Sequence, residues 1–551
     1  MISRQEVIEK KSIIVSEFRS DEESDTQDFV DSNDALQATN IKSELPKKFS
    51  LLSSIGHGFN ITNSWIGYLS SFAISLTYGG PRLVIFSLII GVVFQWIIVA
   101  GLAEIASTYV TSGGQYHYVY LMAPKKTRRF ASFITGWMSS IGWMIELVSA
   151  VAVSANGLIG VILFWAPSFE LNSWKTYLIY LASMIVSVLP LVLFPKNLPQ
   201  VTTFTLFFSL LGCVITFIVC LSMQTHNLAS FVFNNAGMTE YSSGWNAGPA
   251  WLLGSCNAMY AFIGVDSATH IAEEVVVTKS VNPGNIVPLT MNATLIIGFM
   301  SVFPLMIALL FGMTDIDAVL SSSCPSLELF YQNTNNKAVA TFLQVWLTIV
   351  LFCASIGGWV TNSRLTYVLA RDNAMPFSKY FQVIDSKMQL PFRAIIFAGV
   401  FVTLYGLLYF ASTTAFNSII SSSVLGLNIS YVIPQGLYLF RGRKFNIARV
   451  FDLGPIAGPI INIAALGLIV VIGVFDCFPY SLPVTASGMN YVAPVLIGLF
   501  VILILLWFLL GKGFAGPEVD LKKLNALNKN CIESEQLAHE GKGRFLWFFW
   551  I

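Results

Sequence analysis

Residues 49–81 read FSLLSSIGHGFNITNSWIGYLSSFAISLTYGGP, an apolar stretch that small and amide residues interrupt. A helix needs about 20 apolar residues to cross a bilayer core, so this stretch is long enough. Gly58, Asn60 and Asn63 fall in or just before its central turns, where they let the backbone unwind. Because unwound backbone is tolerated inside a membrane only around a buried cavity, the stretch predicts a broken membrane helix that lines a site.

A second stretch, residues 248–275, has the same character and reads GPAWLLGSCNAMYAFIGVDSATHIAEEV. Gly264 lies at its centre, between Phe262 and Asp266. Interrupted segments at corresponding positions of two halves are the best sequence indication of a transporter site. Packing of small residues against neighbouring helices would explain the glycines alone. The two interruptions lie at corresponding positions of the two halves, and one of them carries a carboxylate. Together they favour a transporter site over simple packing.

The composition places both stretches inside a polytopic membrane protein. Hydrophobic types make up 55% of the 551 residues and charged types only 11%, whereas soluble proteins carry about 25% charged residues. Only 32 of the 61 charged residues lie within residues 51–510. So few charges exclude a soluble globular surface for this region, and its high apolar content excludes disorder. The lipid bilayer is therefore the first expected partner.

Apolar segments follow one another along residues 51–510, and all of them are expected to be helices, because a lipid-facing chain must satisfy its own backbone groups. The predicted fold class is therefore an all-α polytopic membrane protein. We predict twelve transmembrane helices, near residues 51–78, 83–108, 130–164, 174–194, 200–223, 249–275, 286–312, 338–371, 394–412, 415–439, 456–476 and 491–511.

The two broken segments divide the predicted helices into blocks. Helices 1–5 occupy residues 49–223 and helices 6–10 occupy residues 249–439, and each block opens on a broken helix. The last two helices follow at residues 456–511. Because each block has an odd number of helices, the second begins from the opposite side of the membrane, which makes the blocks inverted repeats.

Lysine and arginine residues orient the chain. If the N-terminus is inside, the predicted interior loops hold fourteen of them and the exterior loops three. Cytoplasmic loops carry such an excess, so both termini are expected in the cytoplasm. We expect the plasma membrane, with a vacuolar or other endomembrane as the alternative.

Two polar tails, residues 1–48 and 512–551, flank the membrane part. Residues 17–40 are acidic and rich in serine, so the first tail is predicted to be disordered. The tail either solvates the chain or carries regulatory sites for phosphorylation and for a ubiquitin ligase.

Two carboxylates fall near mid-membrane: Asp266 beside the second interruption and Glu146 in the third predicted helix. A charge at that depth costs about 3 kcal/mol to insert, so such groups normally face a cavity and have a role. Asp266 is a candidate for contact with a substrate ammonium or a proton, and the alternative is that it caps the half-helix that follows. Glu146 is a candidate proton acceptor or the partner of a nearby polar group.

Four aromatic residues near these positions form a candidate cage for an ammonium group: Trp65, Trp143, Tyr260 and Trp359. Aromatic faces attract ammonium groups by about 2 kcal/mol or more when water is excluded. Ordinary packing is the alternative for each of them, because 14% of the chain is aromatic.

The sequence contains no recognisable catalytic arrangement, so no enzyme activity is expected. The five histidines lack metal-ligand spacing, and neither a metal nor a cofactor is expected. The missing phosphate-binding loop argues against an ATP-driven pump. The missing voltage-sensor helix and selectivity filter argue against a channel. A formal net charge of +1 argues against nucleic acid as a partner.

Several longer motifs carry a family resemblance over roughly residues 48–510. They are SLLSSIGHGFNITNSWIG with YGGP, GLAEIASTYVTSGGQYHY, AFIGVDSATHIAEEV, NSRLTYVLARDNAMPFSKYF and SLPVTASGMNYVAPV. Together they resemble the fungal amino acid/choline branch of the amino acid–polyamine–organocation transporters. The resemblance implies a leucine-transporter-type fold, in which broken helices 1 and 6 of a five-plus-five inverted repeat form the substrate site.

The resemblance also implies which residues bind the substrate. They are Ile61, Thr62, Asn63 and Ser64 in helix 1, and Phe262, Ile263, Gly264, Val265 and Asp266 in helix 6. Phe262 is implied to be a lid or stacking residue. Glu273 and Glu274 match the family's acidic pair at the cytoplasmic end. They form either an inner gate with basic residues such as Lys125 or Arg371, or a purely structural ion pair.

Known substrates of this branch include amino acids, GABA, choline, polyamines and amino-containing biotin precursors. The resemblance therefore implies a secondary active transporter that moves a small amine-bearing solute by alternating access. A biotin-precursor permease is a narrower alternative, because two of the motifs look most similar to those permeases. Proton coupling is expected from fungal relatives, although predicted helix 5 lacks the lysine that some proton-coupled members place there. The alternative of another class is a nutrient sensor that does not transport.

Overall fold

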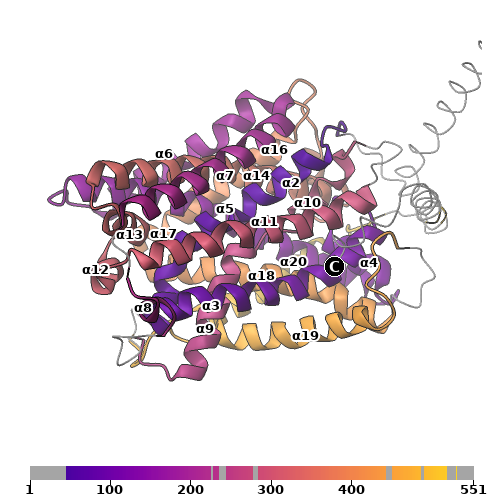
Figure 1. Ribbon diagram of the computed structural model, residues 1–551. Coiled ribbons are helices and arrows are strands. Elements are labelled where there is room, and N and C mark those ends of the chain that lie inside the picture. The colour runs from indigo at the N-terminus through magenta and orange to yellow at the C-terminus, as the bar shows by residue number, and fades with distance from the viewer. Residues whose placement is uncertain are drawn as a thin grey trace, which may run out of the picture.

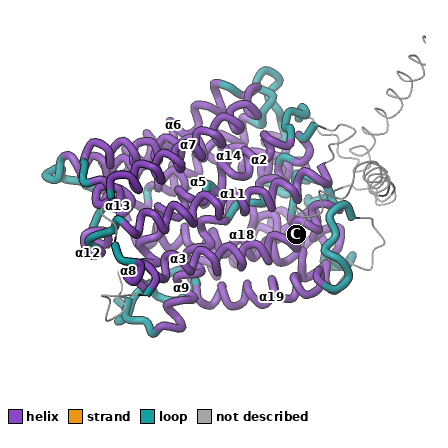
Figure 2. The backbone as a smooth tube through the Cα atoms, viewed as in Figure 1, coloured by secondary structure: helices purple, strands orange, loops and turns teal. Residues whose placement is uncertain are grey.

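The computed structural model describes residues 45–517 with gaps at 225–226, 235–242, 277–282, 412, 442–448 and 486–488, together with residues 526 and 529. Within these residues the backbone forms helices joined by short loops, and the β-structure consists of two isolated bridges. Figure 2 shows this helical content along the whole bundle. The prediction of an all-helical membrane protein is confirmed. Most of tail 1–48 and of tail 512–551 lies outside the described residues.

The helices are α2 (Leu51–Thr62), α3 (Ser64–Thr108), α4 (Gln115–Met122), α5 (Arg128–Trp165), α6 (Ser173–Leu193), η1 (Pro195–Asn197), α7 (Leu198–Met223), α8 (Ala229–Phe233), α9 (Ala247–Met259), η2 (Tyr260–Phe262), α10 (Ser267–His270), η3 (Ala272–Glu274), α11 (Pro283–Phe311), α12 (Ile316–Ser321), α13 (Pro325–Thr334), α14 (Lys337–Arg371), α15 (Ser378–Phe381), α16 (Phe392–Gly406), α17 (Leu408–Ala411), α18 (Thr413–Phe440), α19 (Ala457–Phe475) and α20 (Val492–Leu510).

Nine helical segments of the described chain are long and apolar enough to cross a membrane, and Val424–Phe440 is a shorter apolar helix. Twelve spans stay a prediction. One of the nine, Leu51–Thr108, has 58 residues, about 87 Å of helix against a bilayer core of about 30 Å. Its backbone is not helical at Gly79 and Gly80, just before Pro81, so the segment can fold back there. The segment predicted as helix 6 is divided into α9, η2, α10 and η3, so it contains no long helix.

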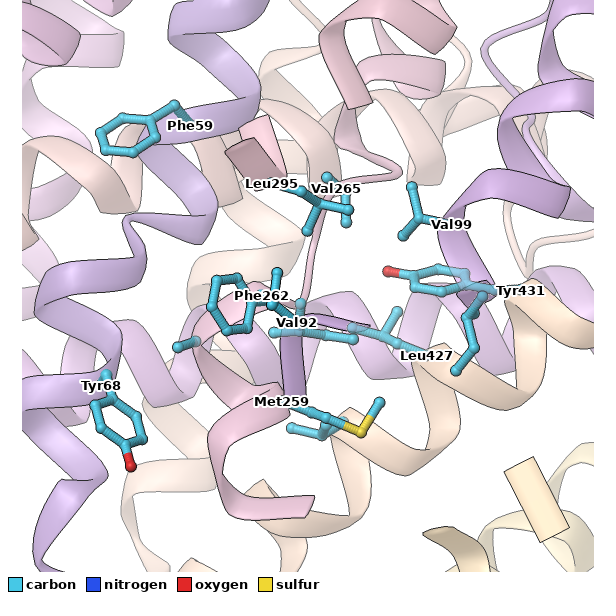
Figure 3. Packing of buried hydrophobic residues seen from close by; sticks show 14 of the residues in the cluster. Phe59, Tyr68, Val92, Val99, Met259, Phe262, Val265, Leu295, Leu427 and Tyr431 are labelled. Atoms are coloured by element: carbon cyan, nitrogen blue, oxygen red, sulfur yellow. The ribbon is translucent and has the colours of Figure 1, made fainter. Parts of the chain in front are cut away.

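The two predicted repeats pack against each other through their long helices. α3 contacts α9 and α11, while α5 contacts α14 and α18. Figure 1 shows these helices side by side along the bundle. Figure 3 shows the hydrophobic core between them, with Phe262, Val265 and Tyr431 close to the interrupted part of helix 6. Both interruptions therefore lie inside the bundle and away from lipid.

The two ends of the bundle differ. We call one end the tail face; it contains residues 45–50, α4, Glu273, Glu274 and residues 511–517. There the backbone N–H of Lys48 donates to the carbonyl of Glu274, and the N–H of Ala515 donates to the carbonyl of Asp372. The opposite face contains α8, α12, α13 and the segment after α19, and α8, α12 and α13 lie at the other end in Figure 1.

Candidate transport site

The first interruption is a single residue, Asn63, between α2 and α3. Its backbone is left-handed, with φ 31° and ψ 57°, a conformation that asparagine tolerates better than most residues. The Asn63 Oδ1 accepts a hydrogen bond of 2.9 Å from Ser209 on α7. Its buried Nδ2 has no hydrogen-bond partner among the described residues. The interruption therefore leaves one amide donor available at the start of α3.

The second interruption is longer and runs from Ile263 to Asp266. Ile263 is extended, with φ −78° and ψ 163°, and Gly264 has φ 82°, which favours glycine. A β-carbon at Gly264 would lie 2.8 Å from Cγ2 of Ile61 and 3.3 Å from the ring of Trp143. Glycine is therefore required both by the backbone conformation and by the close approach of the two broken helices.

A central pocket of about 50 Å³ lies between the two interruptions, α5 and α14. One water needs about 10–15 Å³ of such space, so the pocket holds a small solute group or a few waters. Its lining residues are Ile61, Thr62, Asn63, Gly67, Ser70, Trp143, Glu146, Leu147, Ala150, Val153, Tyr260, Ile263, Leu351, Ala354, Ser355 and Gly358. The structure thus brings together six predicted substrate or cage residues and one of the two predicted carboxylates.

Glu146 is the carboxylate that lines the central pocket. It is half-buried on α5, and its Oε2 has no hydrogen-bond partner in the described part of the chain. Trp143, one turn earlier on α5, and Tyr260 line the same pocket. A buried carboxylate oxygen without a donor is costly, and a ligand with N–H groups or a positive charge would relieve that cost.

Asp266 has the opposite surroundings: it is fully buried and saturated with donors. Its Oδ2 accepts hydrogen bonds from Gln115 Nε2 at 2.7 Å and from Trp143 Nε1 at 3.2 Å. His270 Nε2 lies 3.3 Å from the same oxygen, and Tyr431 donates to Oδ1 at 2.6 Å. Its side chain makes no capping hydrogen bond to α10. The Asp266 carboxylate therefore joins the second interruption to α4, α5 and α18.

Comparison with known proteins identifies the family of this chain. Residues 49–502 match the sequence profile of the family described as "Amino acid permease". The chain belongs to this family. It is an amino acid/choline-type permease, a transporter and not an enzyme.

Several named relatives of the permease are fungal. The choline transporter of Saccharomyces cerevisiae is 34% identical, over 95% of this chain and 90% of the relative. The 7-keto 8-aminopelargonic acid transporter of the same yeast is 29% identical, over 84% of this chain and 92% of the relative. Its GABA-specific permease is 27% identical, over 86% of this chain and 83% of the relative. The predicted family resemblance is confirmed.

Two of the four predicted cage residues of the permease lie elsewhere. Trp65 donates a hydrogen bond of 2.9 Å to Ser209 on α7, and Trp359 donates one of 3.0 Å to Ser187 on α6. Both indoles are buried and neither lines the central pocket. The structure thus places Trp143 and Tyr260 at the pocket and uses the other two tryptophans to join helices.

Five of the nine residues predicted in the substrate site are buried but do not line the central pocket: Ser64, Phe262, Gly264, Val265 and Asp266. Phe262 packs beside Gly298 of α11, and Figure 3 shows it among core residues. Tyr260, a predicted cage residue, lines the pocket, and its hydroxyl is 2.8 Å from Ser149 on α5. Residue type explains this difference, because a tyrosine needs a partner for its hydroxyl whereas a phenylalanine is fully accommodated in the core.

The acidic pair at the tail face forms two ion pairs. Arg364 binds Glu274 through Nε and Nη2, at 2.7 and 3.1 Å, and both side chains are buried. Arg371 Nη1 lies 3.1 Å from Glu273, and Arg371 is one of the two basic residues named as candidate partners of the acidic pair. Because both arginines are on α14, these pairs attach the end of broken helix 6 to α14. Their role as a gate stays a prediction.

A larger cavity, which we call the vestibule, opens beyond Tyr260 toward the opposite face. Its volume is about 470 Å³. It shares Ser70, Val153 and Tyr260 with the central pocket, so the two cavities are neighbours. Its other lining residues are Ser71, Ile74, Thr77, Tyr78, Ser149, Ala152, Asn156, Leu253, Cys256, Asn257, Val424, Phe475, Asp476, Phe478, Tyr480 and Asn490. The central pocket thus lies between an open cavity on one side and ion pairs on the other.

Proposed function

We propose that this permease is a secondary active transporter that moves a small amine-bearing solute across the plasma membrane by alternating access, coupled to protons. The observation that carries the proposal is a pair of unsatisfied groups on one pocket. Glu146 and Asn63 both line the central pocket. Neither the acceptor Oε2 of Glu146 nor the donor Nδ2 of Asn63 has a partner in the described chain. A solute with a cationic end and a polar end would satisfy both groups.

The cationic end of the solute is assigned to Glu146. A carboxylate in low-dielectric surroundings attracts an ammonium group more strongly than it would in water. The aromatic rings of Trp143 and Tyr260, which line the same pocket, add to that attraction. Both effects favour an amine over a neutral solute of the same size.

The polar end is assigned to Asn63. Its free Nδ2 donates to a carboxylate or to a hydroxyl oxygen. Helix α3 begins at Ser64, so the positive end of its dipole lies next to Asn63. This arrangement suits the carboxylate of an amino acid as well as the hydroxyl of choline.

Alternating access follows from the two ends of the bundle. The ion pairs of Arg364 with Glu274 and of Arg371 with Glu273 close the tail face, whereas the vestibule leads toward the opposite face. We propose that opening the tail face requires the end of broken helix 6 to separate from α14 and break both pairs. With the tails in the cytoplasm, this cycle imports the solute.

Asp266 receives a positioning role in this proposal. Its oxygens already accept from Gln115, Trp143 and Tyr431, so a substrate ammonium would have to displace a protein donor. Glu146 is the better candidate for the coupling proton, because this residue lines the pocket and its Oε2 has no partner among the described residues. Proton and substrate would then compete for or share one carboxylate.

The experiment is uptake of labelled choline, GABA, a basic amino acid and 7-keto-8-aminopelargonate in a yeast strain that lacks its own permeases. At least one amine should show saturable uptake that an imposed proton gradient increases. Glu146→Gln should lower kcat/KM about 100-fold, which corresponds to about 2.7 kcal/mol. The matched control is Glu170→Gln, the same substitution at an exposed loop residue, and it should behave as wild type.

Two outcomes would overturn the proposal. Normal uptake by Glu146→Gln would show that the Glu146 carboxylate does not bind the substrate. Signalling in response to an amine, without any uptake of the panel, would favour the nutrient sensor.

The variant Asn63→Asp narrows the substrate class. It keeps the Oδ1 that accepts from Ser209 and replaces the free amide donor with a negative oxygen. Uptake of a carboxylate-bearing amine should then fall at least tenfold, because like charges repel. Uptake of choline should persist, because its hydroxyl can donate to the new carboxylate. A loss of uptake for both solutes, with normal protein levels, would contradict the role of Asn63 as a selective donor.

A further inference from the structure

The vestibule has the chemistry of a cation site that is separate from the central pocket. Five aromatic side chains line it: Tyr78, Tyr260, Phe475, Phe478 and Tyr480. Asp476 is the single carboxylate among the described lining residues, and these residues include neither lysine nor arginine. Carboxylate and aromatic faces together are the usual surroundings of a bound ammonium group.

The structure holds Asp476 in place at the rim of this cavity. Asp476 follows the last residue of α19, and its backbone carbonyl accepts a hydrogen bond of 2.6 Å from Asn490 Nδ2. Cys256, on α9, lines the same cavity as Asp476. The side chain is half-buried, so part of it stays accessible from the cavity. Asp476 is thus tied to the segment before α20.

The aromatic wall around Asp476 is also ordered by packing. Phe478 stacks on Trp245 with ring centroids 5.4 Å apart and an interplanar angle of 13°. Phe475 lies 5.0 Å from Phe478. The indole of Trp245 donates to the carbonyl of Pro479 at 3.0 Å. These contacts fix rings on the side of the cavity that carries Asp476, which reduces the entropy cost of binding a ligand there.

We propose that the vestibule is an outer amine-binding site, in which Asp476 and the surrounding aromatic rings hold an ammonium-bearing solute before it passes Tyr260 into the central pocket. The identity of the solute rests on the proposed function. The existence of a second cation site rests only on Asp476 and the aromatic residues that line the vestibule. Tyr260 separates the two sites because it lines both cavities, and its hydroxyl contact with Ser149 ties it to α5.

The protonation state of Asp476 gives the outer site a pH dependence. Burial raises the pKa of Asp476 to about 7, so its carboxyl group becomes fully anionic only above neutral pH. The titratable groups around it are Tyr78 on α3, Cys256 on α9, and Cys477 and Tyr480 in its own segment. Tyrosine and cysteine side chains are ordinarily neutral at neutral pH, so Asp476 alone sets the charge of the site.

The test is equilibrium binding of labelled choline to the purified full chain in lipid nanodiscs. Choline keeps its charge at every pH, so any pH effect belongs to the protein. Wild type should bind two cholines per chain, Glu146→Gln one and Asp476→Asn one, while the double variant should bind none. In Glu146→Gln, the remaining site should bind about tenfold more tightly at pH 8 than at pH 6, because affinity follows the ionised fraction of Asp476.

The control variant is Asp317→Asn, which removes the same charge from an exposed residue of α12 at the same face. It should bind two cholines, as wild type does. One site in wild type, or two sites in Asp476→Asn, would overturn the outer site. Two sites in Glu146→Gln would instead contradict the proposed function and leave the outer site intact.

Discussion

Asp266 and Glu146 are both carboxylates inside the same helical bundle, yet their surroundings are opposite. Asp266 receives donors from α4, α5 and α18 and lies close to His270 of α10. The Glu146 Oε2 receives no hydrogen bond from the described residues, and Glu146 lines a pocket. A saturated buried acid organises the structure around it, whereas an unsatisfied one is available to a ligand. The difference teaches that depth in the membrane alone does not identify a substrate contact.

The largest effect is expected when Asp266 is replaced by asparagine. The new NH₂ group would face N–H donors such as Gln115 Nε2 and Trp143 Nε1, so at least one buried donor would lose its acceptor. We expect a loss of about 3 kcal/mol in stability. The measurement is thermal unfolding of the solubilised protein. Normal thermal stability together with abolished uptake would break the comparison and move Asp266 into the substrate site.

The next effect concerns the charge of the substrate. Wild type should prefer choline over its neutral carbon analogue, in which carbon replaces the ammonium nitrogen, by about 100-fold, or about 2.7 kcal/mol. Glu146→Gln should lose that preference, because the carboxylate that distinguishes the two solutes is gone. Among folded molecules of Asp266→Asn the preference should persist. Competition for labelled choline uptake measures all three ratios. If the preference for choline is lost in Asp266→Asn and kept in Glu146→Gln, then Asp266 and not Glu146 binds the ammonium group.

The smallest effects come from two tyrosines that each contact one region. Tyr431→Phe removes a donor from Asp266 and should cost about 1.5 kcal/mol of stability, with KM unchanged. Tyr260→Phe removes the contact with Ser149 at the pocket and should change KM by about twofold to fivefold, with stability lowered by less than about 1 kcal/mol. Thermal unfolding and uptake kinetics on the same samples separate the two patterns. If both variants change stability and KM in the same way, the surroundings of Asp266 and the central pocket do not have separate roles.

Much of the fold followed from local chemistry. The interruptions were predicted from small, amide and glycine residues, and the structure places them at Asn63 and at residues 263–266. The backbone conformation of such residues depends on their own type and on a few neighbours, so it can be predicted from a short stretch of sequence. The number of spans stays a prediction. The first two predicted helices, 51–78 and 83–108, are separated at the bend of Gly79, Gly80 and Pro81, but the helical pattern continues across that bend.

The candidate site was only partly predictable. Glu146, Trp143 and Tyr260 were named from depth and type, and all three line the central pocket. Trp65 and Trp359 have the same type, but their indoles bond to Ser209 and Ser187. Periodicity along one helix cannot show which neighbouring helix a ring will meet.

The sequence by itself determined that this protein is a helical membrane permease, and it located two interruptions and two buried acids. These features depend on residue type and on spacing within a single segment. Only the tertiary structure decided which acid is free. The donors to Asp266 include Gln115 and Tyr431, 151 and 165 residues away along the chain. The physical reason is that a carboxylate is satisfied by whatever packs against it, and distant helices determine that packing.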